Sequence, residues 1–556
     1  MVLLFVAFLL FCILHATRGE ILLPSHLASH MVLQQKVKIP FWGMDTPGST
    51  ITVTFQGNQL PSETCDSTGR FNVTLPSSTA SLVPTTIQIS SNSGSATVTL
   101  VDILIGDVYY CSGQSNMELS IVNTANVQDT LSRSTALGSK LRIFSVALDP
   151  SYPSVTTPQL NLTASIPWSQ ASPSTVGGMS ALCYFLAENA VNAHPNVPIG
   201  LLNNAWGGVA IQVYASPQTL AKCNGSEKPP TLHHTVEAAE RAFASARNRN
   251  FDASPINGSC LFYSMVYPLL SFPISLMAWY QGESNMGDPI GYQCLQREMV
   301  KDYRTLWSTM SNANPTFPFF YIQLAAWPTG ITATGSGASL PVFRVASEQT
   351  LVDIPAVAMS VAADISDSSG AYHPIHPLWK RELARRVWLA VDNILYGNTT
   401  SPVAGPKPIK AIFNKWDSSW EDYHFGTGSN SYVCTGGQWT CGGVQITFDS
   451  PVQLRSFYNI ANPITTDLNM YGWVQGSNSG FELRQDMTPT AWTQPVPLVS
   501  ISADGLTVQL NTTWIGPTPA LPTVVTFGWN DYPNGMPLEN SFGLPVGPFN
   551  MTIVVG

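Results

Sequence analysis

One short run of the sequence has the residue types of a serine nucleophile site. Ser115 lies on the turn 112–116, directly after the apolar stretch 107–111, and Gly113 keeps this turn uncrowded. A serine just past the carboxyl end of a strand can attack an ester carbonyl, and its backbone N–H can donate to the resulting oxyanion. An ordinary Gly/Ser/Asn turn has the same composition, and the run is not a G-x-S-x-G elbow. Ser115 is therefore a candidate nucleophile whose partners must be sought elsewhere in the chain.

Two other predicted strands also end in polar or glycine-rich turns. The groups concerned are Gly207 and Gly208 after the strand 199–202, and Gln281, Glu283 and Asn285 after the strand 276–280. A glycine N–H or a side-chain amide can complete an oxyanion hole. Plain turns and solvated loops are the alternative interpretation of each run.

A histidine is needed to activate the serine hydroxyl at neutral pH. His373 and His376 lie in the run 371–377, between the predicted strand 356–362 and the predicted helix 379–395. The remaining histidines outside the N-terminal apolar run are interpreted as structural or solvated. These six are His26, His30, His194, His233, His234 and His424.

The elements that position these residues form three regions. Residues 20–104 alternate in short Thr-, Val- and Ser-rich runs, which predict a small β-sandwich. Residues 105–400 alternate short apolar strands with amphipathic helices, which indicates parallel β-α-β units. Residues 401–556 return to a β-rich pattern without a convincing helix. The other predicted strands are 141–146 and 319–324, and the other predicted helices are 180–192 and 292–306. Ligands of such sheets lie outside the carboxyl ends of the strands.

Bulk composition agrees with a large globular protein. A chain of 556 residues exceeds one ordinary core, and 44% hydrophobic against 11% charged residues allows extensive burial. The net charge of −9 and the lack of a Lys/Arg block argue against a nucleic-acid partner. Residues 1–19 have the pattern of a signal peptide, so we expect a secreted or lysosomal protein without a stable membrane span after cleavage.

Cysteines and sequons fit the secretory pathway. Eight cysteines remain after residue 19, an even number that suits an oxidising compartment. Cys434 and Cys441 are predicted to form a local disulfide, whereas Cys111 is interpreted as a buried thiol. No spacing indicates a zinc site, and no metal is expected. The candidate glycosylation sites are Asn72, Asn161, Asn224, Asn257, Asn398, Asn511 and Asn550.

Taken in order, several runs resemble the sialate O-acetylesterase family within the SGNH (GDSL-like) hydrolases. The matching runs are 31–35, 41–43, 107–118, 206–208, 261–266, 279–285, 375–377 with Lys380, and 543–545 with 548–549. The resemblance implies a three-layer α/β/α SGNH core with a parallel sheet, flanked by N-terminal and C-terminal β-rich domains. It further implies that Ser115 is the nucleophile and His376 the base. The oxyanion site would combine the backbones of Ser115 and of Gly207 or Gly208 with Gln281 or Asn285.

The acid that orients the histidine departs from the wider pattern. The superfamily places an Asp three residues before the histidine, but that position here is His373. Asp364, Asp367 and Glu283 are the alternatives, and Asp367 is preferred. The site can also work as a dyad in which a backbone carbonyl fixes the imidazole tautomer.

The function expected from the sequence is hydrolysis of O-acetyl esters of sialic acids through an acetyl-enzyme, without a metal or organic cofactor. An esterase for acetyl-xylan or another acetylated carbohydrate is the alternative within enzymes. A catalytically inactive secreted sugar-binding protein is the alternative from another class. The oligomeric state is left open by the sequence.

Overall fold

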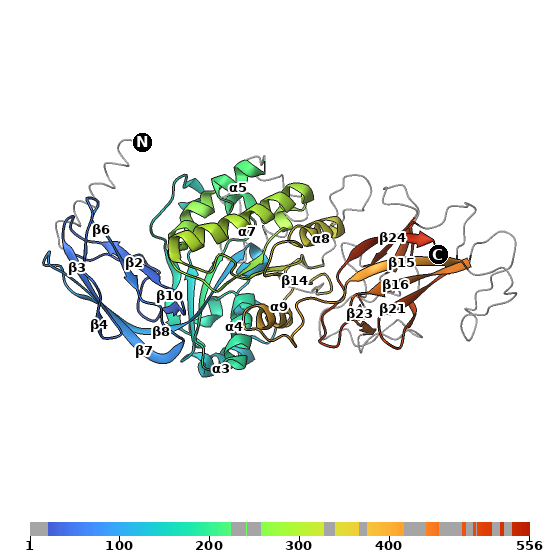
Figure 1. Cartoon of the computed structure of the whole chain (residues 1–556), viewed down its shortest axis with the longest axis horizontal. Helices are drawn as coiled ribbons and strands as arrows, with labels where there is room; N and C mark the ends of the chain where they lie inside the picture. The colour runs from blue at the N-terminus through green and yellow to red at the C-terminus, as the bar shows by residue number, and fades with distance from the viewer. Residues whose placement is uncertain are drawn as a thin grey trace.

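The structure is a computed structural model. It describes residues 20–223, 241, 257–326, 340–365, 375–415, 441–454, 481–484, 493–495, 498–513, 523–527, 536 and 538–555. Three units follow one another along the long axis of the molecule, with an N-terminal β unit, an α/β unit and a C-terminal β unit (Figure 1). The predicted signal peptide lies outside the described residues. No helix within the described ranges is long and apolar enough to cross a membrane.

The N-terminal unit is built from strands whose buried and exposed side chains alternate, as the sequence predicts. In β3, for example, Ile51, Val53 and Phe55 are buried and the intervening threonines are half-buried. The strands are β1 Val32–Gln34, β2 Ile39–Met44, β3 Thr50–Phe55, β4 Asn58–Gln59, β5 Glu63–Thr64, β6 Arg70–Leu75, β7 Ser81–Ser91 and β8 Val98–Gly113. The first part of β8 pairs with β7, and its second part enters the sheet of the α/β unit. The predicted domain boundary after residue 104 therefore falls inside a strand that both units share.

The α/β unit is organised around β8, and its sheet has the order β10-β9-β11-β8-β12-β13-β14. All neighbours are parallel except β10, which is antiparallel to β9. The added strands are β9 Leu141–Val146, β10 Ala164–Gln170, β11 Ile199–Ala205, β12 Leu276–Tyr280, β13 Phe319–Ile322 and β14 Val357–Ser360. The predicted strands are thus confirmed. The carboxyl ends of β8, β11 and β12 meet at one edge of the sheet.

Helices lie on both sides of this sheet, with α5, α7 and α8 on one side and α3, α4 and α9 on the other (Figure 1). Their bounds are α2 Ser115–Glu118, α3 Val127–Leu137, α4 Ala181–Ala193, α5 Pro217–Lys222, α7 Pro289–Ser311, α8 Leu340–Gln349 and α9 Lys380–Ile394. The short helices are η1 Ile121–Asn123, η2 Tyr152–Ser154, η3 Val176–Gly178, η4 Ile211–Val213, η6 Phe262–Val266, η7 Tyr267–Leu269 and η8 Glu283–Asn285. The predicted helices correspond to α4, α7 and α9. The Ser180 hydroxyl caps α4 by accepting from the Cys183 N–H at 3.3 Å.

Two disulfides stabilise the α/β unit, Cys111–Cys183 and Cys223–Cys294. The interpretation of Cys111 as a buried thiol is therefore wrong. Cys111 lies on β8 and Cys183 on the first turn of α4, and packing of this helix on the sheet brings the two side chains together. Cys65 and Cys260 are the buried free thiols among the described cysteines. Cys434 and the Cys441 side chain lie outside the described residues, so their pairing stays a prediction.

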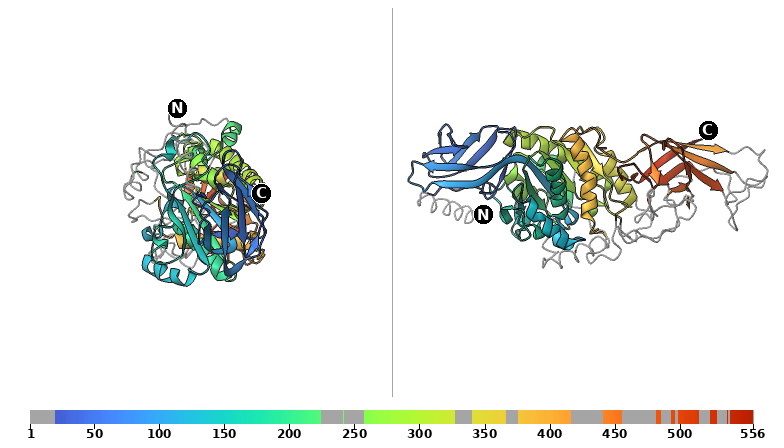
Figure 2. Two further views of the ribbon diagram at one scale, coloured as in Figure 1. Left: turned by 90° about the vertical axis from the view of Figure 1, so that its left-hand side faces the viewer. Right: turned by 90° about the horizontal axis from the view of Figure 1, so that it is seen from below.

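The C-terminal unit is a β unit at one end of the molecule (Figure 2). Its main sheet has eight strands, and the unit has an apolar core of its own. The sheet order is β19-β18-β22-β24-β15-β16-β21-β20, and β17 pairs with β23. The strands are β15 Pro408–Lys415, β16 Cys441–Phe448, β17 Gln453–Leu454, β18 Phe481–Arg484, β19 Thr493–Pro495, β20 Leu498–Ile501, β21 Thr507–Thr513, β22 Val524–Phe527, β23 Leu538–Glu539 and β24 Phe549–Val555. The described part of this unit contains strands and no helix, as the sequence predicts.

Candidate active site

Ser115 begins the one-turn helix α2, immediately after β8 ends. Gly113 has a φ of 138°, and a Cβ at this position would lie 2.0 Å from the Tyr280 carbonyl oxygen. The turn is wedged between the neighbouring strand ends, because the Gln114 N–H donates to the Tyr280 oxygen at 2.9 Å and the Trp206 N–H donates to the Gly113 oxygen at 3.0 Å. Ser115 is fully buried at this junction. Only glycine permits such a close approach of two backbones.

The Gln114 side chain connects the turn that carries Ser115 to the polar loop after β12. Its Oε1 accepts from Gln281 Nε2 at 3.1 Å, from the Gly282 N–H at 3.3 Å and from the Ser284 N–H at 3.2 Å. Three donors on one carbonyl oxygen hold the loop against the strand end that carries Ser115.

The side-chain amides of Gln281 and Asn285 also hold this loop. Gln281 Nε2 donates to Asn285 Oδ1 at 2.8 Å, and Asn285 Nδ2 donates to Gln212 Oε1 at 2.9 Å. Asn285 Oδ1 accepts a further bond from the Ile211 N–H at 2.9 Å. Both predicted oxyanion amides are thus close to the nucleophile turn, but their nitrogens are already engaged by protein acceptors.

The turn after β11 brings the predicted glycines to the same edge. The Gly207 N–H donates to Glu118 Oε2 at 2.6 Å, and Glu118 is buried on α2. Gly208 has a φ of 78°, a left-handed conformation that favours glycine. Of the two glycines, Gly208 is the better candidate for an oxyanion donor because the Gly207 N–H already binds a carboxylate.

A hydrogen bond between a sequence neighbour of Ser115 and a sequence neighbour of His376 connects the two segments. Asn116, next to Ser115, donates from Nδ2 to the carbonyl oxygen of Ile375 at 2.9 Å, and Ile375 precedes His376. His376 is fully buried. The structure therefore brings the Ser115 and His376 segments together, although they are 261 positions apart in the sequence. His373 and Asp367 lie outside the described residues.

A lysine and a glutamate flank this connection. Lys380 Nζ donates to Asn116 Oδ1 at 2.5 Å, and Asn116 Nδ2 donates to Glu283 Oε1 at 2.6 Å. Lys380 is fully buried, and Nζ lies 5.2 Å from the centre of the Tyr280 ring. Burial lowers the pKa of Lys380 to about 7, and the negative charge of Glu283 opposes this shift.

Known proteins with a similar sequence are esterases. No protein-family model matches the sequence. The chain is 29% identical to the sialate O-acetylesterase of Mus musculus over 426 residues, covering 69% of this chain and 75% of the relative. It is 26% identical to that of Homo sapiens over 408 residues, covering 69% and 73%. Both relatives support the resemblance of the chain to the sialate O-acetylesterase family.

A solved structure extends the likeness over the whole fold. A carbohydrate acetylesterase from Xanthomonas citri superposes with a TM-score of 0.71 at 25% identity, covering 96% of this chain and 99% of that one. Both comparisons agree on the reaction class. The chain is a carboxylic ester hydrolase, as the sialate O-acetylesterase relatives and the carbohydrate acetylesterase structure indicate.

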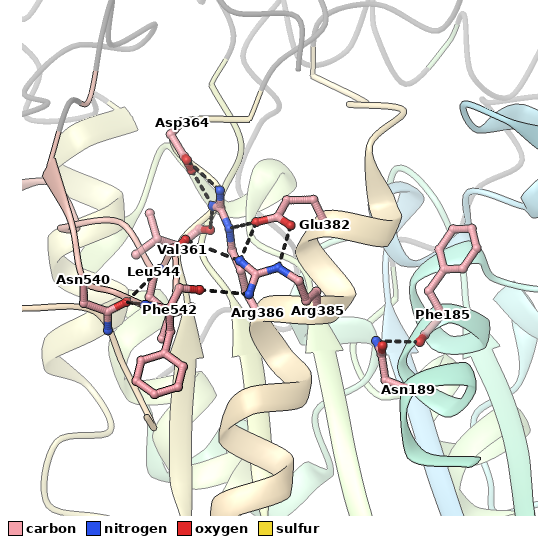
Figure 3. Close-up of polar contacts among 11 residues, drawn as sticks. Phe185, Asn189, Val361, Asp364, Glu382, Arg385, Arg386, Asn540, Phe542 and Leu544 are labelled. Atoms are coloured by element: carbon pink, nitrogen blue, oxygen red, sulfur yellow. Dashed lines mark hydrogen bonds and ion pairs between the residues drawn. The ribbon is translucent and has the colours of Figure 1, made fainter. Parts of the chain in front are cut away.

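Asp364, one of the carboxylates considered as the acid of this esterase, forms a bidentate ion pair with Arg386 (Figure 3). Arg386 Nη1 and Nη2 donate to its two oxygens at 2.6 Å and 2.8 Å, and both side chains are buried. Burial alone would lower the pKa of Arg386, but the charges of Asp364 and Glu382 outweigh it and raise the pKa. The carboxylate thus anchors the start of the segment that leads to His376.

Three residues of this candidate site were not singled out from the sequence. Gln114, Asn116 and Glu118 lie within three positions of Ser115. Each forms a hydrogen bond to another strand end or to the histidine segment. The available signal was a cluster of polar residues, 114–118, in an otherwise apolar region. Buried polar groups require partners, so such a cluster predicts contacts with other polar turns.

Proposed function

We propose that the chain is a carbohydrate O-acetylesterase in which Ser115 is the nucleophile and His376 the general base. The observation that carries this proposal is the bond from Asn116 to the Ile375 carbonyl oxygen, because it joins the two segments one residue from each reacting side chain. His376 takes the Ser115 proton as Ser115 attacks the acetyl carbonyl. The sugar leaves with a proton from the imidazolium, and water then hydrolyses the acetyl-enzyme.

The oxyanion of each tetrahedral intermediate requires donors at the strand ends. The backbone N–H groups of Ser115 and Gly208 are the proposed pair, with Gln281 or Asn285 contributing if its amide exchanges a protein acceptor for substrate. The parallel sheet with helices on both sides supports classification as a three-layer SGNH core. The β-rich regions 20–104 and 401–556 are its proposed flanking domains.

Asp367 remains the proposed orienting acid, since Asp364 is already bound by Arg386. The alternative is a dyad. In that case a backbone carbonyl, rather than a carboxylate, fixes the imidazole tautomer. Neither choice requires a metal or organic cofactor.

O-acetylated sialic acid is the proposed substrate because the relatives are named for acetyl ester hydrolysis on sialic acid. A secretory location, either extracellular or lysosomal, is supported by the two disulfides. Asn72, Asn161 and Asn550 are the best glycosylation candidates, since their side chains are exposed. Asn257 and Asn398 are also exposed, but their amide nitrogens bond to protein acceptors. Asn224 and the Asn511 side chain lie outside the described residues.

Acetate release from O-acetylated sialic acid and from acetyl-xylan tests the proposal. We expect Ser115→Ala to lose at least about 10³-fold in kcat and to lose labelling by a serine-directed phosphonate. Ser132→Ala is the control, because Ser132 is exposed on α3 and bonds only within its helix. Full activity of the Ser115 variant would contradict the mechanism. Faster turnover of acetyl-xylan than of O-acetylated sialic acid would change the proposed substrate to an acetylated plant polysaccharide.

A further inference from the structure

Asn116 uses the full hydrogen-bonding capacity of its side-chain nitrogen, and its oxygen is also bound. Oδ1 accepts from Lys380, and the two Nδ2 hydrogens go to Glu283 and to the Ile375 carbonyl. The ammonium can only donate, and a carboxylate or a carbonyl can only accept. The partners therefore determine which way this fully buried amide points.

Burial of the charged Lys380 side chain destabilises the folded state. Lys380 is the first residue of α9, where the helix dipole disfavours positive charge, and it is fully removed from water. A methionine of similar volume would avoid the cost of burying a charge. Three groups offset the cost of burying this charge: Asn116 Oδ1, the Tyr280 ring and the negative charge of Glu283. All three lie at the edge of the sheet that carries Ser115.

Asn116 and its three partners lie at four different places in the fold. Asn116 follows β8, Glu283 follows β12, Ile375 precedes the base, and Lys380 begins α9. Opposite charges on the two ends of an amide polarise it and strengthen its hydrogen bonds. The bond to Ile375 is the one that holds the histidine segment against the serine turn.

We propose that Lys380, Asn116 and Glu283 form a positioning relay that sets the relative placement of Ser115 and His376. This inference rests on the proposed function, since it assumes that these two residues react. No atom of the relay enters the chemistry. Its contribution is geometric, and a misplacement of about 1 Å at a reacting centre can cost about 10²-fold in rate.

Lys380→Met is the first test because it preserves the volume and removes the charge. We expect kcat to fall about 10- to 100-fold, KM to stay within about twofold, and phosphonate labelling of Ser115 to slow by the same factor as kcat. Arg381→Met is the matched control on the same helix. It removes a half-buried charge that pairs with Glu188, and its kcat should match the wild type.

The pH profile separates positioning from general stability. Lys380 loses its charge as the pH rises through about 7, so the wild-type kcat should decline on the alkaline side. This decline should be absent from Lys380→Met. The charged group facing Lys380 is Glu283, and the ring facing it is that of Tyr280. A variant with an unchanged alkaline limb would contradict the relay.

Glu283→Gln is the milder second variant, because its oxygen still accepts from Asn116 while the charge is gone. We expect kcat to fall about 3- to 10-fold with a melting temperature close to wild type. Wild-type kcat in both Lys380→Met and Glu283→Gln overturns the relay if Ser115→Ala is inactive. An active Ser115→Ala variant overturns the proposed function instead.

Discussion

The N-terminal β unit shares a strand with the α/β unit, whereas the C-terminal β unit has a core of its own. Buried residues on both sides of the first boundary, such as Val53 and Leu201, belong to one continuous apolar cluster. The contact is tightened by Trp168, whose Nε1 donates to the His26 carbonyl at 2.9 Å. The first unit is therefore expected to fold together with the catalytic unit.

The second boundary is more polar. Val361 and Ala363 of the α/β unit pack into the C-terminal core, and polar contacts also cross this boundary. Lys407 pairs with Glu348 at 3.3 Å, and Arg385 Nη1 donates to the Phe542 carbonyl at 3.0 Å (Figure 3). The C-terminal unit therefore contacts the α/β unit through α8, α9 and the residues after β14, and its core is separate from the main apolar cluster.

Trp168→Ala tests the continuous core and has the largest expected effect. Loss of this buried ring and its hydrogen bond should lower the free energy of unfolding by about 3–5 kcal/mol. In denaturant, the N-terminal and α/β units should unfold together in one transition. Phe542→Ala, at the exposed edge of the other boundary, should change the free energy of unfolding by less than about 0.5 kcal/mol. Separate melting of the N-terminal unit would contradict the comparison.

Arg386→Met tests the buried ion pair on the α/β side of the polar boundary. It leaves the buried Asp364 carboxylate without this cation, which should cost about 3 kcal/mol of unfolding free energy and lower the rate of acetate release. The double variant Arg386→Met, Asp364→Asn removes both charges and should recover part of the stability. An equal loss in the single and double variants would mean that the ion pair does not hold this segment.

His26, at the boundary between the N-terminal and α/β units, should make the free energy of unfolding depend on pH in the acid range. Burial lowers its pKa to about 3, against an ordinary value of 6.5. Between these values the unfolded chain binds more protons, so stability is lost as the pH falls from 6.5 towards 3, at up to about 1.4 kcal/mol per pH unit. The measurement is denaturant unfolding at pH 7 and pH 5. His26→Leu should reduce this pH dependence.

Phe272→Leu is the control for the His26 experiment. The Phe272 ring packs edge-on against His26, with the ring centres 5.8 Å apart. The substitution should lower stability by similar amounts at both pH values, because it removes packing and no titrating group. A steeper loss in acid for this variant would assign the effect to packing.

The sequence predicts the elements of the site better than its contacts. The bounds of β9 agree with the predicted strand 141–146, because its short apolar run has clear ends. The position of Ser115 after β8 follows from the same reasoning, since an apolar run directly precedes a glycine turn.

The contacts depend on how the elements pack. Cys111 pairs with Cys183 because α4 lies on the sheet at that height, and eight cysteines permit many other pairings. The binding of Asp364 by Arg386 has the same origin. These side chains are 22 positions apart and become neighbours only when α9 packs beside β14.

Strand β8 contains 16 residues and passes from the N-terminal β unit into the sheet of the α/β unit, with an irregularity at Asp102, whose φ is 56°. One end of this strand lies in the N-terminal β unit and the other delivers Ser115. The N-terminal unit and the turn that carries Ser115 are therefore joined by one strand that is paired in both units, so displacement of either unit would act directly on the position of Ser115.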